Sequence, residues 1–481
     1  MKDHGTRRRV LATRRVLVTR RVPVTCVAVV VAMAVMFLSG PARAAGRPSA
    51  GDVDWDAVSR EAVDLLRAYV RIPSVNPPAD TRATAAFLKE ILGKEGIEAR
   101  LFERAPGKVN LLARLKASPG LGTAKAGPLL LLHHMDVVPV DAARWPVDPF
   151  GGEIKDGFIQ GRGTADMKGV GILHLMVMLT LQRRHVPLGR DVLLMATADE
   201  ETGGHDGARW MIEHLGDELR PEYVLDEGGF GSRDVMAADG RLVYAISVGE
   251  KKMLWLRLKA TGTAGHGSQP IEDNANGLMS GALAEILERV GDLTPRQTAV
   301  VAELSSRVGE LADNRFTRAI RRDTVSLTTL RSGVGDPPKV NVIPSVAEAT
   351  FDCRLLPDTD PDQFVKRIFD PGKTGMTLET VYRMDDTPVT PHDTEMFRAL
   401  EGAILAAHPG AVVAPTLIPY GTDSNAFRVQ GAKAYGLNPM VVDASIIASL
   451  HSDNERVPVA EMGKGARILY DAVLRVVTKM P

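Results

Sequence analysis

Histidine and carboxylate residues occur in five clusters along the chain, each at the end of an apolar run or within a glycine-rich stretch. The clusters are His133-His134-Met135-Asp136, Gly161-Arg162-Gly163-Thr164-Ala165-Asp166-Met167-Lys168-Gly169, Asp199-Glu200-Glu201, Leu225-Asp226-Glu227-Gly228-Gly229 and Leu450-His451-Ser452-Asp453-Asn454-Glu455. Imidazole nitrogens and carboxylate oxygens are the ligands of paired metal ions in hydrolases. Together the clusters therefore predict a two-metal hydrolase site. Taken singly, each has a simpler explanation, as a satisfied structural side chain or as negative charge at a helix N-terminus.

The spacing within the first cluster separates two roles. His134 and Asp136 are two residues apart, so on an extended segment their side chains project to the same side, and His133 projects to the other. A histidine ligand needs an acceptor for its second ring nitrogen, which fixes the tautomer and the ring orientation. Asp136 is the candidate for that acceptor.

Short apolar runs alternate with helical patterns in the first half of the chain. Strands are predicted at 110–116, 128–133, 191–197 and 223–225, and helices at 54–69, 81–92, 169–184 and 208–215. This alternation predicts an α/β fold in which helices flank both faces of a mixed sheet. Ligands of open α/β sheets bind outside the carboxyl ends of the strands. Because the clusters follow the predicted strands, we expect them to converge there.

The middle of the chain has a different pattern. Elements are predicted in the order strand, helix, strand, strand, helix, strand at 252–261, 274–290, 325–332, 347–355, 360–369 and 376–384. This is the order of a ferredoxin-like α+β domain, and a polar helical stretch at 294–322 is interpreted as an insertion. After Asp386 the α/β character resumes. We therefore expect a catalytic domain in two parts, 52–247 and 387–481, around an inserted domain at 248–386.

The clusters lie within longer stretches that resemble the zinc aminoacylase/carboxypeptidase metallopeptidase family, which includes acetylornithine deacetylase, succinyl-diaminopimelate desuccinylase and glutamate carboxypeptidase. The stretches are His134-Met135-Asp136-Val137-Val138-Pro139, Gly161 to Gly169, Asp199-Glu200-Glu201-Thr202-Gly203 and Gly265-His266-Gly267-Ser268. Leu225 to Gly229 and the helical insertion resemble the carboxypeptidase S branch most. The resemblance covers essentially the whole chain after residue 44. It implies a zinc-exopeptidase-like catalytic domain with an inserted lid and dimerisation domain.

The resemblance also implies a role for each polar residue of the clusters. Asp166 would bridge two Zn²⁺ ions, and Co²⁺ or Mn²⁺ could occupy the same ligands. One ion would be completed by His134 and Asp226, and the other by Glu201 and His451. Glu200 would be left as the general base that takes a proton from water and returns it to the leaving amine.

Further residues are implied outside the metal ligands. His266 of the inserted domain would stabilise the oxyanion, commonly in the active site of the partner subunit of a homodimer. Asn341 and Arg354 match family positions that bind the substrate carboxylate, which a guanidinium fork suits. Gly421 and Thr422 resemble the family's substrate loop. Without the resemblance, His266 and Arg354 have equally simple explanations as surface residues.

The first 44 residues are set aside as a signal peptide. Arginine clusters precede an apolar run, Val27 to Leu38, which is about 12 residues long and short for a membrane span. Ala42-x-Ala44 fits signal-peptidase cleavage. The alternatives are an uncleaved anchor and, for the arginine pairs, a twin-arginine export signal. We therefore expect a secreted or periplasmic protein without a stable membrane anchor.

Removal of residues 1–44 leaves an acidic chain. That segment holds nine Lys/Arg and one Asp, so 50 basic and 58 acidic residues remain, a net charge of −8. An acidic chain argues against nucleic acid as a partner. The remaining cysteine, Cys353, can form no intramolecular disulfide and supplies no cysteine-based zinc site.

Three functions follow from these observations. The first is a carboxypeptidase or dipeptidase that cleaves an amide bond next to a free carboxylate. The second is an N-acyl-amino-acid deacylase with the same machinery. The third, of a different class, is a non-catalytic relative that binds peptides. The presence of Glu200 together with all five expected ligands argues against the third.

Overall fold

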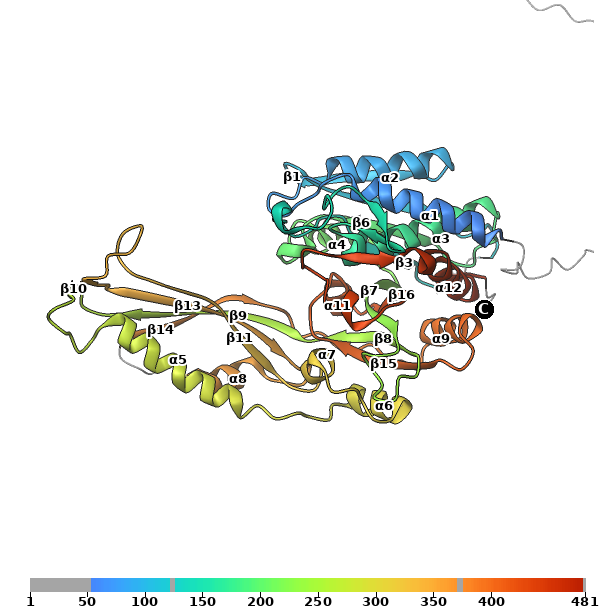
Figure 1. Ribbon diagram of the computed structural model, residues 1–481. Helices are drawn as coiled ribbons and strands as arrows, with labels where there is room; N and C mark the ends of the chain where they lie inside the picture. The colour runs from blue at the N-terminus through green and yellow to red at the C-terminus, as the bar shows by residue number, and fades with distance from the viewer. Residues whose placement is uncertain (1–52, 122–125, 370–374, 479–481) are drawn as a thin grey trace, which may run out of the picture. The chain divides into compact units, whose positions relative to one another are not determined.

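The computed structural model describes residues 53–121, 126–369 and 375–478, and the predicted signal peptide at 1–44 lies outside these ranges. An eight-stranded mixed sheet forms the centre of the larger domain (Figure 1). In spatial order its strands are β1 (Ala99–Ala105), β2 (Lys108–Leu115), β6 (Val192–Thr197), β3 (Leu129–His134), β7 (Tyr223–Ser232), β16 (Lys433–Val441), β8 (Val243–Glu250) and β15 (Val412–Ile418). Strands β6, β3, β7 and β16 run parallel to one another. The predicted α/β fold is confirmed.

The two faces of this sheet enter different cores because side chains alternate along a strand. On β3, Leu129 and Leu131 belong to one core, and Leu130 and Leu132 to the other. The first core includes residues of α1 (Trp55–Val70), α2 (Arg82–Lys94), α3 (Gly169–Arg183), α9 (Glu395–Ala407) and α12 (Val459–Val477). The second includes residues of α4 (Ala208–Leu215) and α10 (Ser424–Val429). Both faces of the sheet are therefore covered by helices.

Helix α3 is apolar on all sides, unlike its neighbours. The segment Thr164–Arg183 is long and apolar enough to cross a membrane, but 89% of its most apolar window is buried inside the protein. A helix that is apolar all round is one that other elements surround. It contacts α12 and α1, and it begins directly after the Asp166 cluster. This helix thus anchors one of the polar clusters to the core.

The smaller domain is a four-stranded antiparallel sheet with two helices on one face. The spatial order is β11 (Thr324–Ser332), β13 (Val346–Leu355), β9 (Lys252–Thr261) and β14 (Met376–Arg383), covered by α5 (Ala275–Gly291) and α8 (Pro361–Ile368). The order of elements along the chain is the predicted one, and the arrangement is ferredoxin-like. A short pair, β10 (Gly265–His266) and β12 (Val342–Ile343), lies at the end of this sheet remote from the larger domain (Figure 1).

The polar helical stretch predicted as an insertion in the smaller domain packs against the larger domain. It forms α6 (Ala299–Val308) and α7 (Arg315–Ala319). Val301, Leu304 and Ile320 are fully buried in the core of the larger domain, and α6 packs against β15. The chain between 252 and 386 is therefore not all part of the smaller domain. It crosses between the domains near 251, between α5 and α6, between α7 and β11, and again after β14.

A small three-stranded sheet carries the last polar cluster back to the earlier ones. Strand β17 (Arg456–Pro458) pairs with β5 (Phe158–Gln160), which pairs with β4 (Glu153–Lys155). The amide of Gly161 donates to the carbonyl oxygen of Glu455 at 3.0 Å. This pairing places the segment 451–455 beside the glycine-rich segment 161–166, although almost 300 residues separate them along the chain.

Candidate metal centre

Asp166 lies between two histidines that are far apart in sequence. Its Oδ1 is 3.0 Å from Nε2 of His134, and its Oδ2 is 3.0 Å from Nε2 of His451. His134 ends β3 and is buried, whereas His451 is half-exposed at the mouth of the site. Each carboxylate oxygen thus faces a different imidazole, which is the arrangement of a carboxylate that bridges two metal ions.

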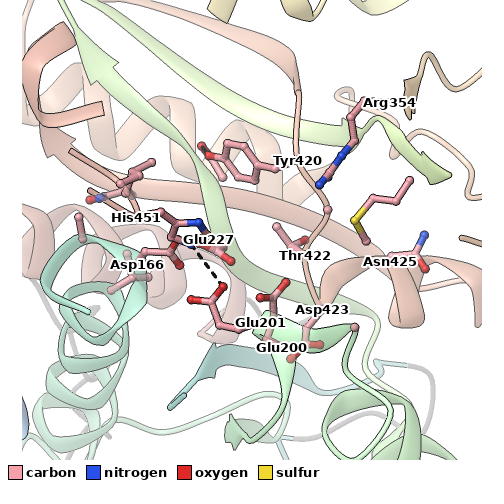
Figure 2. A pocket seen from close by; sticks show the side chains of 18 of the residues that line it. Asp166, Glu200, Glu201, Glu227, Arg354, Tyr420, Thr422, Asp423, Asn425 and His451 are labelled. Atoms are coloured by element: carbon pink, nitrogen blue, oxygen red, sulfur yellow. Dashed lines mark hydrogen bonds and ion pairs between the residues drawn. The ribbon is translucent and has the colours of Figure 1, made fainter. Parts of the chain in front are cut away.

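Two further carboxylates complete the groups. Oε1 of Glu227 is 3.6 Å from Nε2 of His134, and Oε2 of Glu201 is 3.3 Å from Nε2 of His451. In the described part of the chain, the candidate metal groups are His134, Asp166 and Glu227, and Asp166, Glu201 and His451; in each, one ligand atom per residue lies within 4.8 Å of the others. Figure 2 shows Asp166, Glu201, Glu227 and His451 converging on one side of a pocket.

These residues fit a pair of divalent cations. Oε1 of Glu201 is buried and has no hydrogen-bond partner among the described residues, as expected of an oxygen that faces a cation. Hydrogen bonds to Asp166 and Glu201 raise the pKa of His451 to about 10. Burial raises the pKa of Glu227 well above its ordinary range, and the nearby carboxylate of Asp166 raises it further. Such a concentration of buried carboxylates favours bound positive charge. The donors are all nitrogen or oxygen, which suits zinc, cobalt and manganese.

Glu227 occupies the position that we expected for Asp226. The pairing of β7 with β16 shifts register here, because Gly436 pairs with Asp226 and Leu437 pairs with Gly229. Glu227 lies in this irregularity. The backbone of Gly436 passes so close to the carbonyl oxygen of Glu227 that a side chain at position 436 would collide with it, because a Cβ there would be 2.0 Å away. Asp226 instead accepts hydrogen bonds from the amide (3.0 Å) and hydroxyl (2.8 Å) of Ser424. The expectation for Asp226 is therefore wrong, because neighbouring side chains on a strand point apart and its carboxylate holds the start of α10.

Asp136 supports the site in a different way from the one expected. Nδ1 of His134 is 2.9 Å from the backbone carbonyl oxygen of Asp136, and 3.7 Å from its carboxylate. The backbone carbonyl therefore fixes the imidazole. The carboxylate of Asp136 accepts from the amides of Glu200 and Glu201, both at 3.2 Å, and from the side chain of Asn76 at 2.7 Å. Asp136 thus orients the turn that carries the predicted base.

The backbone around Asp166 is held by a buried glutamate of the fifth cluster, to which the sequence assigned no role. Glu455 accepts hydrogen bonds from the amides of Gly163 (3.0 Å), Ala165 (2.8 Å) and Asp166 (3.0 Å). Its other partner is the buried guanidinium of Arg162 at 2.6 Å. Four donors on two oxygens hold the segment rigidly, as is usual for groups that orient metal ligands.

Glu200 lies in the pocket beside both metal groups. It begins a short 3₁₀ turn, Glu200–Thr202, directly after Asp199, whose φ of 76° is in the left-handed region. Asp199 is held there by Lys108 and by the hydroxyl of Thr202 at 2.6 Å. Burial raises the pKa of Glu200 well above its ordinary value, and the carboxylates of Glu201 and Asp423 raise it further. A carboxylate with a raised pKa and access to the pocket has the properties of a general base.

The pocket next to these groups has a volume of about 340 Å³, which is sufficient for a small ligand. Among the residues predicted to bind substrate, Arg354, Gly421 and Thr422 line it, and Figure 2 shows Arg354 across the pocket from His451. The amide of Thr422 donates to the carboxylate of Glu250, a buried residue at the end of β8 that also pairs with Arg428. The predicted substrate loop is therefore held by a buried carboxylate that is itself paired with Arg428.

His266 and Asn341 lie elsewhere. His266 is exposed on β10, and its Nδ1 is 2.7 Å from the hydroxyl of Ser268. The amide of Gly267 donates to the carbonyl oxygen of Asn341 at 2.8 Å, so these two predicted residues are neighbours. Neither is among the residues that line the pocket of the same chain. His266 is part of β10, which lies at the end of the smaller domain remote from the larger one (Figure 1).

Comparison with known proteins agrees with this geometry. The family described as peptidase family M20/M25/M40 matches residues 130–475, and the chain belongs to this family. Aminoacylase-1 of Sus scrofa is 31% identical over 428 residues, which cover 87% of this chain and 96% of that protein. The protein is thus a member of a family of metal-dependent peptidases and aminoacylases. The resemblance to the carboxypeptidase S branch stays a prediction.

Solved structures share the fold. The M20 family metallo-carboxypeptidase of Sulfolobus solfataricus superposes with a TM-score of 0.64 at 21% identity, covering 86% of this chain and 98% of that one. A dinuclear metal-binding peptidase of the M20 family from Bacillus subtilis superposes with a TM-score of 0.55 at 14% identity, covering 88% and 99%. At these identities the likeness concerns the fold, in which a catalytic domain carries an inserted lid domain.

Proposed function

We propose that the protein is a dinuclear zinc hydrolase that cleaves an amide bond next to a free carboxylate, as a carboxypeptidase or dipeptidase does. One observation carries the proposal. Two metal-ligand groups share Asp166, Glu200 lies beside them, and the same pocket is lined by Arg354 on its far side. A reacting amide and a substrate carboxylate can therefore be held at once.

His134, Asp166 and Glu227 would hold one ion, and Asp166, Glu201 and His451 the other. Divalent ions in these positions polarise the scissile carbonyl and stabilise the negative charge that develops on its oxygen. The carboxylate of Glu200 takes a proton from the attacking water and returns it to the leaving amine nitrogen. Arg354 pairs with the free carboxylate of the substrate, and the turn held by Asp136 keeps Glu200 in place.

An N-acyl-amino-acid deacylase is the second candidate, and the similarity to aminoacylase-1 favours it. The two reactions use the same attack on an amide carbonyl and the same carboxylate contact. They differ only in whether the group on the far side of the amide carries an amine.

We also propose that the protein acts as a homodimer in which His266 and Asn341 serve the partner's pocket. Two features support this. Both residues lie away from the pocket of their own chain, and β11 is an edge strand of the smaller sheet with Leu327 and Leu330 exposed at 40% and 56%. An exposed edge with apolar side chains is suited to pairing with a second copy.

Export is part of the proposal and rests on the amino-terminal segment. The arginine clusters, the apolar run from Val27 and the Ala42-x-Ala44 site together favour a cleaved signal peptide. Sequencing the amino terminus of the protein recovered from the periplasm or medium of its source cells tests this. A protein that retains residues 1–44 and stays with the membrane would contradict it.

The test of the activity uses zinc-loaded protein and a panel of dipeptides and N-acyl amino acids. We expect hydrolysis of part of the panel, its loss with a chelator, and its recovery with zinc. Glu200→Gln should lower kcat by roughly a thousandfold while the protein still binds two metal ions, because only the proton acceptor is lost. Glu213→Gln, on the exposed side of α4, is the matched control. Wild-type protein that binds metal and peptides but hydrolyses none of the panel would instead support the non-catalytic alternative.

A further inference from the structure

One face of the sheet in the smaller domain is left open beside the pocket. Leu254, Leu256 and Leu258 of β9 point into the core formed with α5 and α8. The alternating residues Met253 and Trp255 therefore point to the opposite face, where they are only partly buried and line the pocket. This open face brings large apolar side chains to a pocket whose other wall is strongly acidic.

Two aromatic rings form the centre of this face. Trp255 and Tyr382 are register partners on β9 and β14, and their ring centroids are 5.2 Å apart at an interplanar angle of 45°. The hydroxyl of Tyr382 accepts from Arg209 at 3.4 Å, and Arg209 also pairs with Asp385 at 3.0 Å. The hydroxyl of Tyr382 therefore has a hydrogen-bond partner, and both rings line the pocket. We call Met253, Trp255, Tyr382 and Met384 the aromatic subsite.

Arg354 fixes where the substrate lies relative to this subsite. It is the register partner of Met253 on the neighbouring strand β13, so the two backbones are separated by one strand spacing of about 4.8 Å. Asp352 holds its guanidinium through two hydrogen bonds of 2.7 and 3.0 Å. A carboxylate bound to Arg354 therefore places the substituents of its own α-carbon beside Met253 and the two rings.

We propose that the aromatic subsite binds a large apolar side chain on the substrate residue that carries the free carboxylate. The inference rests on the proposed function and adds to it the chemical class of the residue next to the cleaved bond. Substrates with aromatic or long aliphatic side chains are favoured because these side chains displace water from the rings of Trp255 and Tyr382. Substrates with small side chains leave that water in place. The subsite therefore selects among substrates that the metal centre would treat alike.

The test compares kcat/KM for N-acetyl-L-phenylalanine with that for N-acetyl-L-alanine. We expect zinc-loaded wild-type protein to prefer phenylalanine, and Trp255→Ala or Tyr382→Ala to lower the ratio by about tenfold. Tyr382→Phe keeps the ring and should keep the ratio. Arg257→Ala is the matched control, because Arg257 lies two residues farther along the same face of β9, pairs with Glu379 and does not line the pocket.

Two outcomes would overturn the proposal. If Trp255→Ala and Tyr382→Ala lowered kcat/KM equally for both substrates, the rings would serve closure of the domains and not selection. If they removed a preference for N-hexanoyl-L-alanine over N-acetyl-L-alanine and left the phenylalanine ratio unchanged, the apolar group bound there would be the acyl chain. Because Tyr382 is on an edge strand, its variant remains informative even if Trp255→Ala does not fold.

Failure of the proposed function is distinguishable from failure of this inference. If wild-type protein hydrolyses neither substrate, the activity is wrong, and calorimetric binding of the two N-acetyl amino acids to zinc-loaded protein still decides the subsite. The proposed subsite is supported if the wild-type protein binds the phenylalanine derivative more tightly than the alanine derivative and Tyr382→Ala abolishes this difference. Equal binding of both compounds by the wild-type protein contradicts it.

Discussion

The two domains hold their functional residues in opposite ways. At the strand ends of the larger sheet, the backbone amides of Glu200, Glu201 and Asp166 donate to the buried carboxylates of Asp136 and Glu455. In the smaller domain, His266 is exposed and hydrogen-bonds Ser268, two residues away. A metal site depends on fixed distances and is built on packed elements, whereas a residue proposed to act across an interface between subunits can lie on an exposed one. Substitutions in the two regions should therefore have different effects on metal content and on activity.

The largest effect is expected at Glu227, because its substitution would remove one of the proposed metal ligands. Glu227→Ala should lower kcat/KM on the order of a thousandfold and reduce the metal content from two ions to one per chain. Asp226→Asn is the adjacent control, which keeps an acceptor for Ser424 and should retain both ions and activity within about tenfold. Metal analysis and steady-state kinetics measure both. The reverse pattern would restore Asp226 as the ligand.

The next effect is expected at the remote end of the smaller domain. His266→Ala should lower kcat by about a hundredfold, the cost of one donor to the oxyanion, without loss of metal. Mixed with Glu200→Gln, it should regain part of the activity, because a heterodimer has one pocket with both groups intact. Each variant mixed only with itself is the control. No recovery on mixing would show that the two residues do not serve one pocket across an interface.

A smaller loss is expected beneath the bridging carboxylate. Glu455→Gln leaves one acceptor oxygen for four donors, so the backbone at Ala165 and Asp166 loses part of its support. We expect metal affinity and kcat/KM to fall ten- to a hundredfold. Asp453→Asn lies in the same segment and breaks only the pair with exposed Arg144, so it should change both by less than about twofold. Equal effects of the two variants would contradict a role for Glu455 in orienting Asp166.

The smallest effect concerns stability at the crossing between the domains. Burial lowers the pKa of Lys251 to about 7, and its Nζ donates to the carbonyl oxygen of Ala319 at 3.0 Å and the hydroxyl of Thr324 at 2.9 Å. In the unfolded chain the lysine keeps its proton up to about pH 10.4. Between these pH values the unfolded state binds more protons, so this residue makes the free energy of unfolding rise with pH.

Lys251→Met should therefore flatten the rise in the free energy of unfolding between pH 7 and 9, by up to about 1 kcal/mol per pH unit. Urea unfolding at several pH values measures the slope. Lys94→Met, an exposed residue of α2 that pairs with Glu90, should leave the slope unchanged. An unchanged slope in Lys251→Met would show that the lysine keeps its proton in the folded protein.

Local hydrophobic patterns in the sequence predicted most helices and strands, but they could not predict contacts between residues far apart along the chain. The strand expected at 252–261 is β9 with the same bounds, because its alternation is regular. Strand β15 was not predicted, and it contains Pro415, a residue that argues against a strand. The proline is tolerated because β15 lies at the edge of the sheet. Most of the candidate site was predictable because its residues end strands of one sheet.

Two parts of the site were not predictable, for physical reasons. The sequence alone gives no reason to choose Asp226 or Glu227 as the ligand. The choice depends on the irregular pairing of β7 with β16, where the backbone of Gly436 comes close to that of Glu227. Glu455 and Glu250 act through partners 293 and 178 residues away along the chain. The sequence placed Glu455 in the fifth cluster without a role, and it gave no signal for Glu250.

The return of α6 and α7 to the larger domain changes the mechanics of the lid. A body attached by two neighbouring chain segments twists about them more easily than one attached by four segments. Lys251 reinforces this, since it ties the first crossing to the third through Ala319 and Thr324. A change in the angle between the two domains would therefore have to deform all four segments and the Lys251 contacts together.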